Sequence, residues 1–256
     1  MVKWKFYRMK ISIIIPTYNE AKHIGKLIEY LRKQDMGCVD DIIVSDGGSN
    51  DDTMMIAAHA KAHTVISPSN GRAPQLNYGA SFAQGDVLSF VHADTIPPKT
   101  YAQDIILAVT RGYDLGRFLS EYQSDSWLLK INSFLSRIDT FEGMGADQTL
   151  FIKRSLFQEN GGFNTSIKIM EEFEFCSRAR HNKNYKIIQK PVLISARKYK
   201  TNSWLKVQKA NYIAMKMFKA GASQDSVAKR YREMLKPYLG LFCILIDLLS
   251  RLRHTM

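Results

Sequence analysis

The sequence has few cysteines, and their positions suggest no shared role. Three cysteines, Cys38, Cys176 and Cys243, are spread over 256 residues. An odd number of widely separated cysteines, without the close spacing of metal ligands, argues against both a disulfide framework and a structural zinc site. We therefore expect reduced thiols and a cytoplasmic protein.

Long apolar segments are also missing. The first ten residues are basic, but no apolar core follows them as it would in a signal peptide, so we expect no secretory leader. Near the other end, residues 238–246 are strongly apolar, but Asp247 interrupts them. We expect that this stretch is too short to span a bilayer by itself.

Acidic residues are scarce in the C-terminal third. Residues 177–256 contain 3 Asp and Glu against 18 Lys and Arg, whereas residues 1–176 contain 21 acidic and 18 basic side chains. The net charge of +12 therefore comes from the last third of the chain. Such asymmetry favours an anionic partner there, either a membrane surface, an acidic substrate or nucleic acid. No nucleic-acid-binding motif is present, so that class ranks last.

The first hundred residues alternate between predicted strands and predicted helices. Short β-branched or apolar runs predict strands at residues 11–15, 41–45, 64–66 and 87–91, and helical apolar spacing separates them. This order predicts a mainly parallel α/β sheet of Rossmann type with right-handed crossovers. The first strand is not followed by G-x-G-x-x-G, and no P-loop occurs, so a nucleotide site must be built differently.

The part of the chain after residue 100 is predicted with less regularity. Residues 101–109 and 127–138 have helical spacing, and residues 115–122 and 149–152 suggest strands. Glu171 begins a further predicted helix, and two short strands are expected at residues 186–188 and 192–197.

Two basic amphipathic helices are predicted at residues 203–220 and 223–235. The first of them places one set of apolar residues on a single face: Trp204, Val207, Ala210, Ala214, Met217 and Phe218. Lysines occupy the other side. This pattern favours an element that lies on a membrane surface, and the alternative is that the apolar face packs on the domain.

Acidic groups follow several predicted strands. The run at residues 87–91 ends in a short turn that carries His92 and Asp94, and Pro97-Pro98 prevent its continuation. In open α/β sheets, ligands bind at the carboxyl edge of the strands. A carboxylate at that edge can hold a divalent cation against a diphosphate. Asp46 and the pair Glu171-Glu172 are further candidates for such a site.

Four segments together resemble the nucleotide-binding half of the family 2 glycosyltransferases. They are ISIIIPTYNE (residues 11–20), IIVSDGGSNDDT (42–53), NGRAPQLNYGA (70–80) and GDVLSFVHADT (85–95). GADQTLFI (145–152), GGF (161–163) and MEEFEFCSRAR (170–180) resemble the acceptor half of that family. The resemblance covers about residues 10–200 in order. The motifs look most like a bacterial subgroup in which the family's D-x-D is H-A-D.

The resemblance implies a GT-A fold, a nucleotide-diphosphate sugar donor and a divalent cation, manganese or magnesium. It places seven residues around the donor: Pro16, Thr17, Glu20, Asp46, Arg72, His92 and Asp94. Several of these residues have a plainer alternative. Asp46 is also a common turn residue, Glu20 suits a helix N-terminus and Arg72 suits a solvated loop.

The metal ligand implied by the resemblance is Asp94. His92 replaces the first aspartate of the motif, where it could contact ribose or phosphate, or add a nitrogen ligand that favours manganese. The alternative for His92 is a hydrogen-bonded histidine at a strand end. A metal at this corner would neutralise charge on the departing diphosphate.

The general base implied by the resemblance is one of the pair Glu171-Glu172, since the family has Glu-Asp there. The base must accept the proton of the acceptor hydroxyl as that hydroxyl attacks the anomeric carbon. A pair of acids in the first turn of a helix is the alternative. Asp147, Gln148 and Arg178 are expected on the acceptor side, and Arg178 is also spaced to pair with Glu174.

These inferences lead to one prediction of function. We expect a metal-dependent inverting glycosyltransferase near the inner face of the cytoplasmic membrane, with a lipid-linked or glycan acceptor. Residues 1–200 would form the GT-A domain, with a nucleotide-sugar half (10–100) and an acceptor half (101–200), followed by a basic helical segment (201–256). The alternatives are a degenerate domain that binds a nucleotide sugar without turnover, and a nucleotidyltransferase. The basic glycine-rich N-terminal loop expected of the latter is missing.

Overall fold

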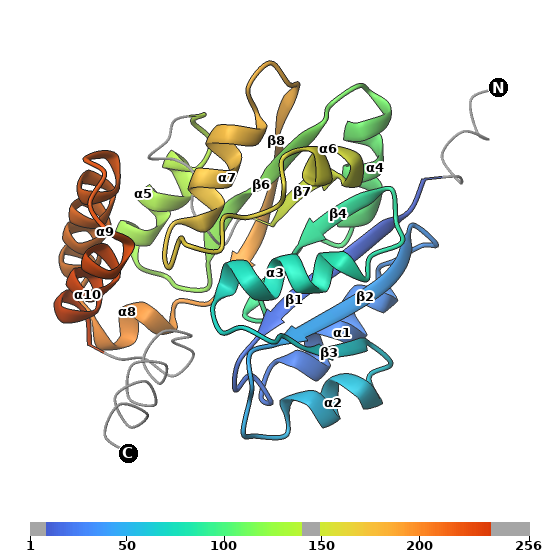
Figure 1. Cartoon of the computed structure of the whole chain (residues 1–256), viewed down its shortest axis with the longest axis horizontal. Coiled ribbons are helices and arrows are strands. Elements are labelled where there is room, and N and C mark those ends of the chain that lie inside the picture. Colours follow the sequence, from blue (N-terminus) through green and yellow to red (C-terminus); the bar gives the residue numbers. More distant parts are fainter. Residues whose placement is uncertain (1–8, 140–148, 237–256) are drawn as a thin grey trace.

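Eight strands form one mixed sheet in the computed structural model, which describes residues 9–139 and 149–236 (Figure 1). In chain order they are β1 (Ile11–Thr17), β2 (Val39–Asp46), β3 (His63–Ile66), β4 (Val87–Phe90), β5 (Thr95–Ile96), β6 (Leu115–Tyr122), β7 (Leu150–Lys153) and β8 (Tyr185–Ile194). Their order across the sheet is β3-β2-β1-β4-β7-β6-β8-β5.

The described helices alternate with these strands and then continue beyond them. They are α1 (Ile24–Lys33), α2 (Thr53–His59), α3 (Arg72–Ser81), α4 (Tyr101–Thr110), α5 (Trp127–Leu135), α6 (Arg154–Glu159), α7 (Glu171–Ala179), α8 (Arg197–Thr201), α9 (Trp204–Lys219) and α10 (Gln224–Met234). The α/β class and the mainly parallel sheet predicted from the sequence are confirmed.

The first half of the sheet is parallel, and it is covered on both faces. β1 pairs in parallel with β2 and β4, and β2 pairs in parallel with β3. Alternate residues of a strand point to opposite faces. Ile13 and Ile15 therefore pack in one buried cluster with α1 and α4, whereas Ile14 packs in a second cluster with α3 and α7. This explains the continuous β-branched run, because neither face of β1 meets solvent.

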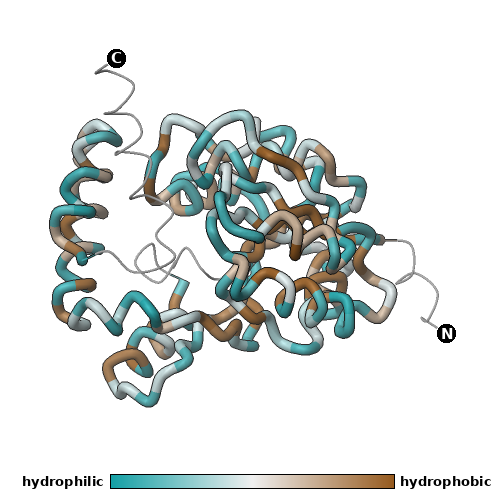
Figure 2. The backbone as a smooth tube through the Cα atoms, turned by 90° about the horizontal axis from the view of Figure 1, so that it is seen from below, coloured by the Kyte–Doolittle hydropathy of each residue, from teal (hydrophilic) through white to brown (hydrophobic). Residues whose placement is uncertain are grey.

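The second half of the sheet contains two strands that run opposite to the rest, β7 and the edge strand β5, which pairs antiparallel with β8. β7 lies antiparallel between β4 and β6, and β6 pairs in parallel with β8. Because β6 is reached through two antiparallel pairings, β6 and β8 end at the same edge of the sheet as β1, β2 and β4. The apolar strand segments lie inside the body of the molecule (Figure 2).

Three details differ from the sequence prediction. Residues 185–194 form one strand rather than two, with a register shift opposite Phe118/Leu119 that accommodates Pro191. β5, of two residues, and α8, of five, were not predicted.

The centre of the apolar face of α9 packs within the protein. Val207 and Ala210 are buried in a cluster with Leu235, next to Tyr199 and Met234. For these residues the packing alternative holds, whereas contact of the C-terminal helices with a membrane remains a prediction. No helix in the described part of the chain is both long and apolar enough to cross a membrane.

Candidate functional site

The carboxyl edge of the sheet brings the predicted donor residues together. Thr17, the last residue of β1, lies beside Asp46, the last residue of β2, in the parallel register. The turn after β4 carries His92 and Asp94 to the same edge. The edge expected to hold the ligand site is thus the one where these side chains meet.

Asp46 organises the loop that follows β2. Its carboxylate is buried and accepts hydrogen bonds from Thr17 Oγ1 at 2.9 Å, from the backbone N–H groups of Gly48 and Ser49 at 2.8 and 2.7 Å, and from Ser49 Oγ at 2.6 Å. The carboxylate is therefore engaged within the protein. Its contact with a base or ribose remains a prediction.

Gln75 fixes the carboxyl ends of β1 and β2. This fully buried side chain on α3 donates to the carbonyl oxygens of Thr17 and Ser45 at 2.8 and 2.9 Å. Pro16 is buried in β1 next to Ser45, and its contact with the donor remains a prediction.

The Glu172 side chain meets the His92 ring at the centre of the site. His92 Nε2 lies 2.8 Å from Glu172 Oε1, and both side chains are buried. Burial raises the pKa of Glu172 above the ordinary glutamate value, against the opposing effect of His92. A buried carboxylate held in one orientation by an imidazole is suited to accept a proton.

Glu171 makes a different contact, although it is the neighbouring residue. Its Oε1 atom lies 3.1 Å from Nη1 of Arg72, the first residue of α3. Both glutamates are in the first turn of α7, where the helix dipole favours negative charge. The residue before them, Met170, adopts a left-handed backbone with φ of 71° that starts the helix at this point. The two acids are thus separated into distinct environments.

Asp94 and Glu20 both contact the guanidinium of Arg197, a residue that no sequence motif singled out. Arg197 Nη2 lies 2.7 Å from Glu20 Oε1 and 3.0 Å from Asp94 Oδ2, and Nη1 contacts Glu20 Oε2 at 3.3 Å. Arg197 begins α8 directly after the last long strand. The only available signal was a basic residue following the end of β8, which alone is weak.

Burial shifts the pKa values of Glu20 and Arg197 in this cluster. Burial raises the pKa of Glu20, although Arg197 acts in the opposite direction. Burial also disfavours the charge on Arg197, but its contacts with Glu20 and Asp94 prevail and raise its pKa. The guanidinium therefore stays charged between the two carboxylates.

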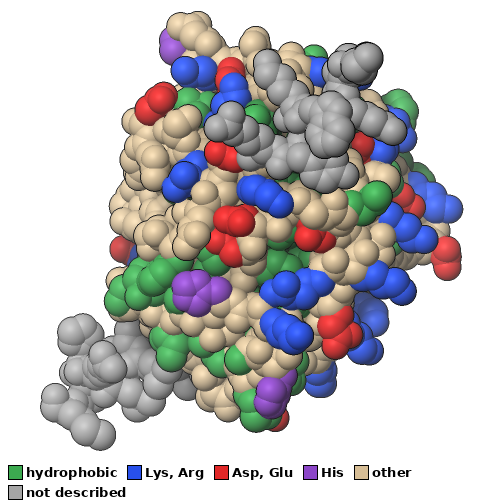
Figure 3. Space-filling model, turned by 90° about the vertical axis from the view of Figure 1, so that its right-hand side faces the viewer, with side chains coloured by type: hydrophobic (Ala, Val, Ile, Leu, Met, Phe, Trp, Pro, Cys, Tyr) green, Lys and Arg blue, Asp and Glu red, His purple; other side chains and the backbone are tan. Residues whose placement is uncertain are grey.

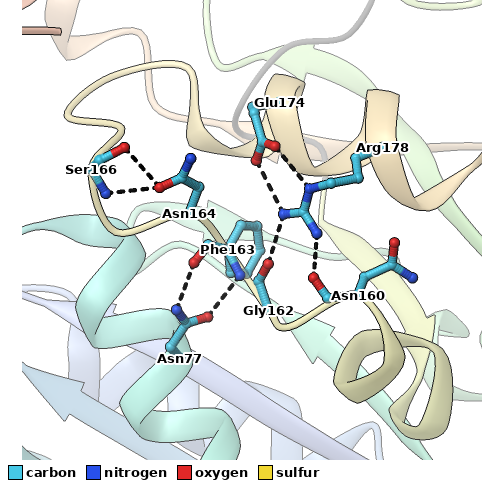
Figure 4. Close-up of polar contacts among 8 residues, drawn as sticks. All are labelled: Asn77, Asn160, Gly162, Phe163, Asn164, Ser166, Glu174 and Arg178. Atoms are coloured by element: carbon cyan, nitrogen blue, oxygen red, sulfur yellow. Dashed lines mark hydrogen bonds and ion pairs between the residues drawn. The ribbon is translucent and has the colours of Figure 1, made fainter.

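Arg178 contacts its own helix and the loop that follows α6 (Figure 4). It contacts Glu174 Oε1 at 2.8 Å through Nε, donates to the carbonyl oxygen of Gly162 at 2.8 Å, and donates also to that of Asn160. This is the i, i+4 pair that the sequence offered as the simpler interpretation. A role of Arg178 toward the acceptor remains a prediction, and Asp147 and Gln148 lie outside the described residues.

The same close-up shows how α3 is tied to the acceptor-side half. Asn77 Nδ2 donates to the carbonyl oxygen of Phe163 at 2.8 Å, and Phe163 N donates back to Asn77 Oδ1 at 2.9 Å (Figure 4). Gly162 has φ of +70°, and an added Cβ there would come within 2.6 Å of Asn77 Oδ1. The pair therefore fixes the loop that leads toward α7.

Sequence comparison identifies relatives that match parts of the chain. The chain is 31% identical over 96 residues to the glucosyl-3-phosphoglycerate synthase of Mycolicibacterium smegmatis. This aligned stretch covers 34% of the chain and 32% of the relative. The chain is 28% identical over 150 residues to the poly(ribitol-phosphate) beta-N-acetylglucosaminyltransferase TarS of Staphylococcus aureus, which is 56% of this chain and 23% of the relative. The matched stretches thus span about a third or less of these curated relatives.

Solved structures share the fold at low sequence identity. The mannosyltransferase PcManGT of Pyrobaculum calidifontis, in complex with GDP-Man and Mn²⁺, gives a TM-score of 0.64 at 20% identity and covers 84% of this chain and 64% of that one. Glucosyl-3-phosphoglycerate synthase of Mycobacterium tuberculosis, with Mn²⁺, UDP and glucosyl-3-phosphoglycerate, gives 0.57 at 19% identity, covering 84% and 81%. The chain has the GT-A fold that the resemblance implied.

A family model described as glycosyl transferase family 2 matches residues 12–159. The match includes β1, β2, β4 and the turn with Asp94, and it extends over more than half of the chain. The chain belongs to glycosyl transferase family 2.

Proposed function

We propose that this protein transfers a sugar from a nucleotide-diphosphate sugar to an acceptor hydroxyl, with inversion at the anomeric carbon. The observation that carries the proposal is the buried contact between Glu172 and His92, two residues before Asp94 at the carboxyl edge of the sheet. The Glu172 carboxylate and the turn proposed to bind the diphosphate therefore lie in one site. A single displacement requires this, because the base and the leaving group must act on the same sugar.

Glu172 is the general base in this proposal. Its raised pKa and its fixed orientation suit proton removal from a hydroxyl. Glu171 is paired with Arg72, so the proposal gives it the role of holding that arginine at the N-terminus of α3. From there Arg72 can reach a phosphate.

A divalent cation fits the site only together with the donor. In the described residues no group of three or more His, Cys, Asp or Glu side chains could hold a metal. Manganese and magnesium are often held by one or two carboxylates and the substrate's phosphates, and Asp94, with 22% of its side chain exposed, can supply such a carboxylate. The cation would supply charge neutralisation for the leaving diphosphate.

His92 is better explained as a positioning residue than as a metal ligand. Its Nε2 atom faces Glu172, so ligation through that atom would break the contact. Thr17, Pro16 and the Asp46 loop would surround the nucleoside, and Arg197 would contact the diphosphate, because guanidinium groups bind such oxygens in a bidentate manner.

The proposal also covers the organisation and the location of the reaction. Residues 10–100 would bind the donor and residues 101–200 the acceptor, with residues 201–256 as a basic extension. The acceptor would be lipid-linked or a glycan, used at the cytoplasmic face of a membrane. The basic composition of the C-terminal third supports this location.

Nucleotide release tests the proposal. The full chain is incubated with UDP- and GDP-sugars and manganese or magnesium, since the solved neighbours include UDP and GDP-Man complexes. We expect metal-dependent release that Asp94→Asn abolishes and Glu172→Gln reduces without loss of nucleotide binding. If Glu172→Gln released nucleotide as fast as the wild type, Glu172 would not be the base. If the chain bound no nucleotide in the presence of metal, the proposed function would be wrong.

A further inference from the structure

Helix α5 has its apolar side facing outward. Five large apolar side chains on α5 and on the turn after it are 40–68% exposed: Trp127, Ile131, Phe134, Leu135 and Ile138. They follow Trp127 by four, seven, eight and eleven residues, so they share one side of the helix. We call these five residues the α5 stripe. A continuous apolar stripe of this kind on a protein surface marks an interaction site.

Polar contacts on the other side of α5 fix this orientation. The carbonyl oxygen of Ser136 accepts a hydrogen bond from the buried Arg117 at 2.9 Å, and Ser136 Oγ accepts one from Ser120 N at 3.1 Å. Asn132 Oδ1 accepts from Trp204 Nε1 at 3.3 Å. Rotation of α5 to bury the stripe would break all of these contacts and leave Arg117 buried without them.

Basic side chains surround the α5 stripe. Lys130 on α5 and Arg137 in the turn after it are exposed, and so are Asp125 and Asp139 at the two ends of the stripe. The contact between Asn132 and Trp204 places the start of α9 next to α5, and there Leu205 is 72% exposed and precedes the exposed Lys206. Residues 197–236 contain 11 Lys and Arg against 2 Asp and Glu. The opposite end of the molecule instead intermingles acidic and basic side chains (Figure 3).

We propose that the α5 stripe docks on an anionic lipid surface. Large aromatic and aliphatic side chains with a basic rim are the composition of an interfacial helix, in which apolar groups enter the headgroup region and lysines contact anionic lipids. A partner protein surface or a second copy explains the apolar residues but gives no role to the excess of positive charge.

Docking in this way would bring the proposed site close to the lipid. β6 ends at Tyr122 beside Ile194, and Gln123 N donates to the carbonyl oxygen of Ile194 at 2.9 Å. Ser195 N then donates to the carbonyl oxygen of Asp94 at 3.2 Å. Helix α5 therefore starts at the sheet edge that carries Asp94. This step rests on the proposed function, and it implies an amphiphilic acceptor held in the membrane.

Vesicle binding by the full chain tests the proposal. The probes are vesicles of phosphatidylcholine alone and vesicles that also contain phosphatidylglycerol, with binding measured by co-sedimentation at low and high salt. We expect binding to the anionic vesicles, weakened by salt. The double substitution Ile131→Ser and Phe134→Ser should weaken it by about tenfold or more, because each large side chain contributes on the order of 1 kcal/mol or more when it leaves water.

Matched variants exclude a general effect of surface change. Met55→Ser and Ile66→Ser remove exposed apolar side chains, 53% and 64% exposed, on α2 and β3, and should leave vesicle binding unchanged. Lys130→Glu with Arg137→Glu should reduce binding to anionic vesicles more than tenfold, since two attractive charges near such a surface become repulsive. Equal binding by wild type and the Ile131/Phe134 double variant would overturn the proposal, as would absence of binding.

Two further measurements identify other occupants and separate this inference from the proposed function. Light scattering measures whether the chain is a dimer. If the wild type is a dimer, and the Ile131/Phe134 double variant is a monomer with unchanged vesicle binding, the α5 stripe contacts a second copy instead. Nucleotide release from the donor without vesicles should be equal in the double variant and wild type. Failure of lipid binding with intact nucleotide release would therefore overturn only the docking inference.

Discussion

His92 Nε2 lies 2.8 Å from Oε1 of Glu172, and the two side chains are buried together although 80 residues separate them in the sequence. This contact distinguishes Glu172 from Glu171, whose carboxylate contacts Arg72 instead. Two adjacent residues of the same type thus have different partners, and their substitution should have different consequences.

Glu172→Gln should lower kcat about 10²- to 10⁴-fold, the range that a lost general base gives, while donor binding changes little. Glu171→Gln should mainly weaken donor binding, because it releases Arg72. The comparison is made by steady-state kinetics with calorimetric nucleotide titration. Glu174→Gln is the control for donor binding, because its carboxylate pairs with Arg178 and not with His92 or Arg72. A larger loss of kcat in Glu171→Gln would exchange the two assignments.

Arg197→Lys should raise the KM for the donor about tenfold, although charge is conserved. A lysine cannot contact Glu20 and Asp94 with the planar geometry of the guanidinium, nor bind a diphosphate in a bidentate manner. Arg180→Lys is a matched control, because Arg180 contacts both carboxylate oxygens of Asp139. An unchanged donor KM in Arg197→Lys would remove Arg197 from the donor site.

The first half of the fold was predictable because its signals are local. Strand β1 is buried on both faces, so all of its residues except Ser12 are β-branched or apolar, and the period of α1 is visible in Ile24, Leu27, Ile28 and Leu31. Strand β5 has two residues, too few for any periodicity. In β8, Pro191 interrupts the pattern, yet the strand continues through a register shift that only the pairing partner reveals.

The site was predictable where one motif carries it, and less so where distant residues combine. Short motifs point to Asp94 and to the pair Glu171-Glu172, and only the contacts in the structure distinguish the two glutamates. Arg197 contacts Glu20 across 177 residues, and a basic residue after a strand has no distinctive local pattern. Helix α5 shows a related difficulty, because amphipathic spacing predicts a helix with an apolar face but does not say whether that face points inward.

Stability should depend on pH through Asp114, which joins the ends of three strands. Its carboxylate contacts Lys153 Nζ at 2.7 Å and accepts from Asn184 N at 3.0 Å. Burial tends to raise the pKa of Asp114, but these two contacts outweigh it and lower the pKa below the ordinary value of 3.8. A lowered pKa stabilises the fold above the unfolded-state pKa, and this stabilisation is lost as the pH falls through the folded-state pKa.

Asp114→Asn should therefore reduce the free energy of unfolding by about 1 kcal/mol at pH 7, and the difference from wild type should shrink below about pH 4. Denaturant titrations at pH 7 and at about pH 3 measure it. Asp225→Asn is the control, since the Asp225 carboxylate pairs with Lys168 in a fully exposed position and should contribute little. A difference for Asp114→Asn that grows toward low pH would contradict the assignment.

Asn77→Ala should destabilise the fold by about 2 kcal/mol, because it removes two hydrogen bonds to the backbone of Phe163 and leaves that N–H and carbonyl without them. The matched control is Asn164→Ala, whose side chain accepts only from the nearby Ser166 in an exposed loop, and whose loss should cost under about 0.5 kcal/mol (Figure 4). Urea denaturation gives both values.

Gly162→Ala should behave like Asn77→Ala, since its φ of +70° disfavours alanine and the new Cβ would press on Asn77 Oδ1. If Asn77→Ala were as mild as Asn164→Ala, the tie between α3 and the loop before α7 would not contribute to stability, and the approach of Glu171 to Arg72 would need another support.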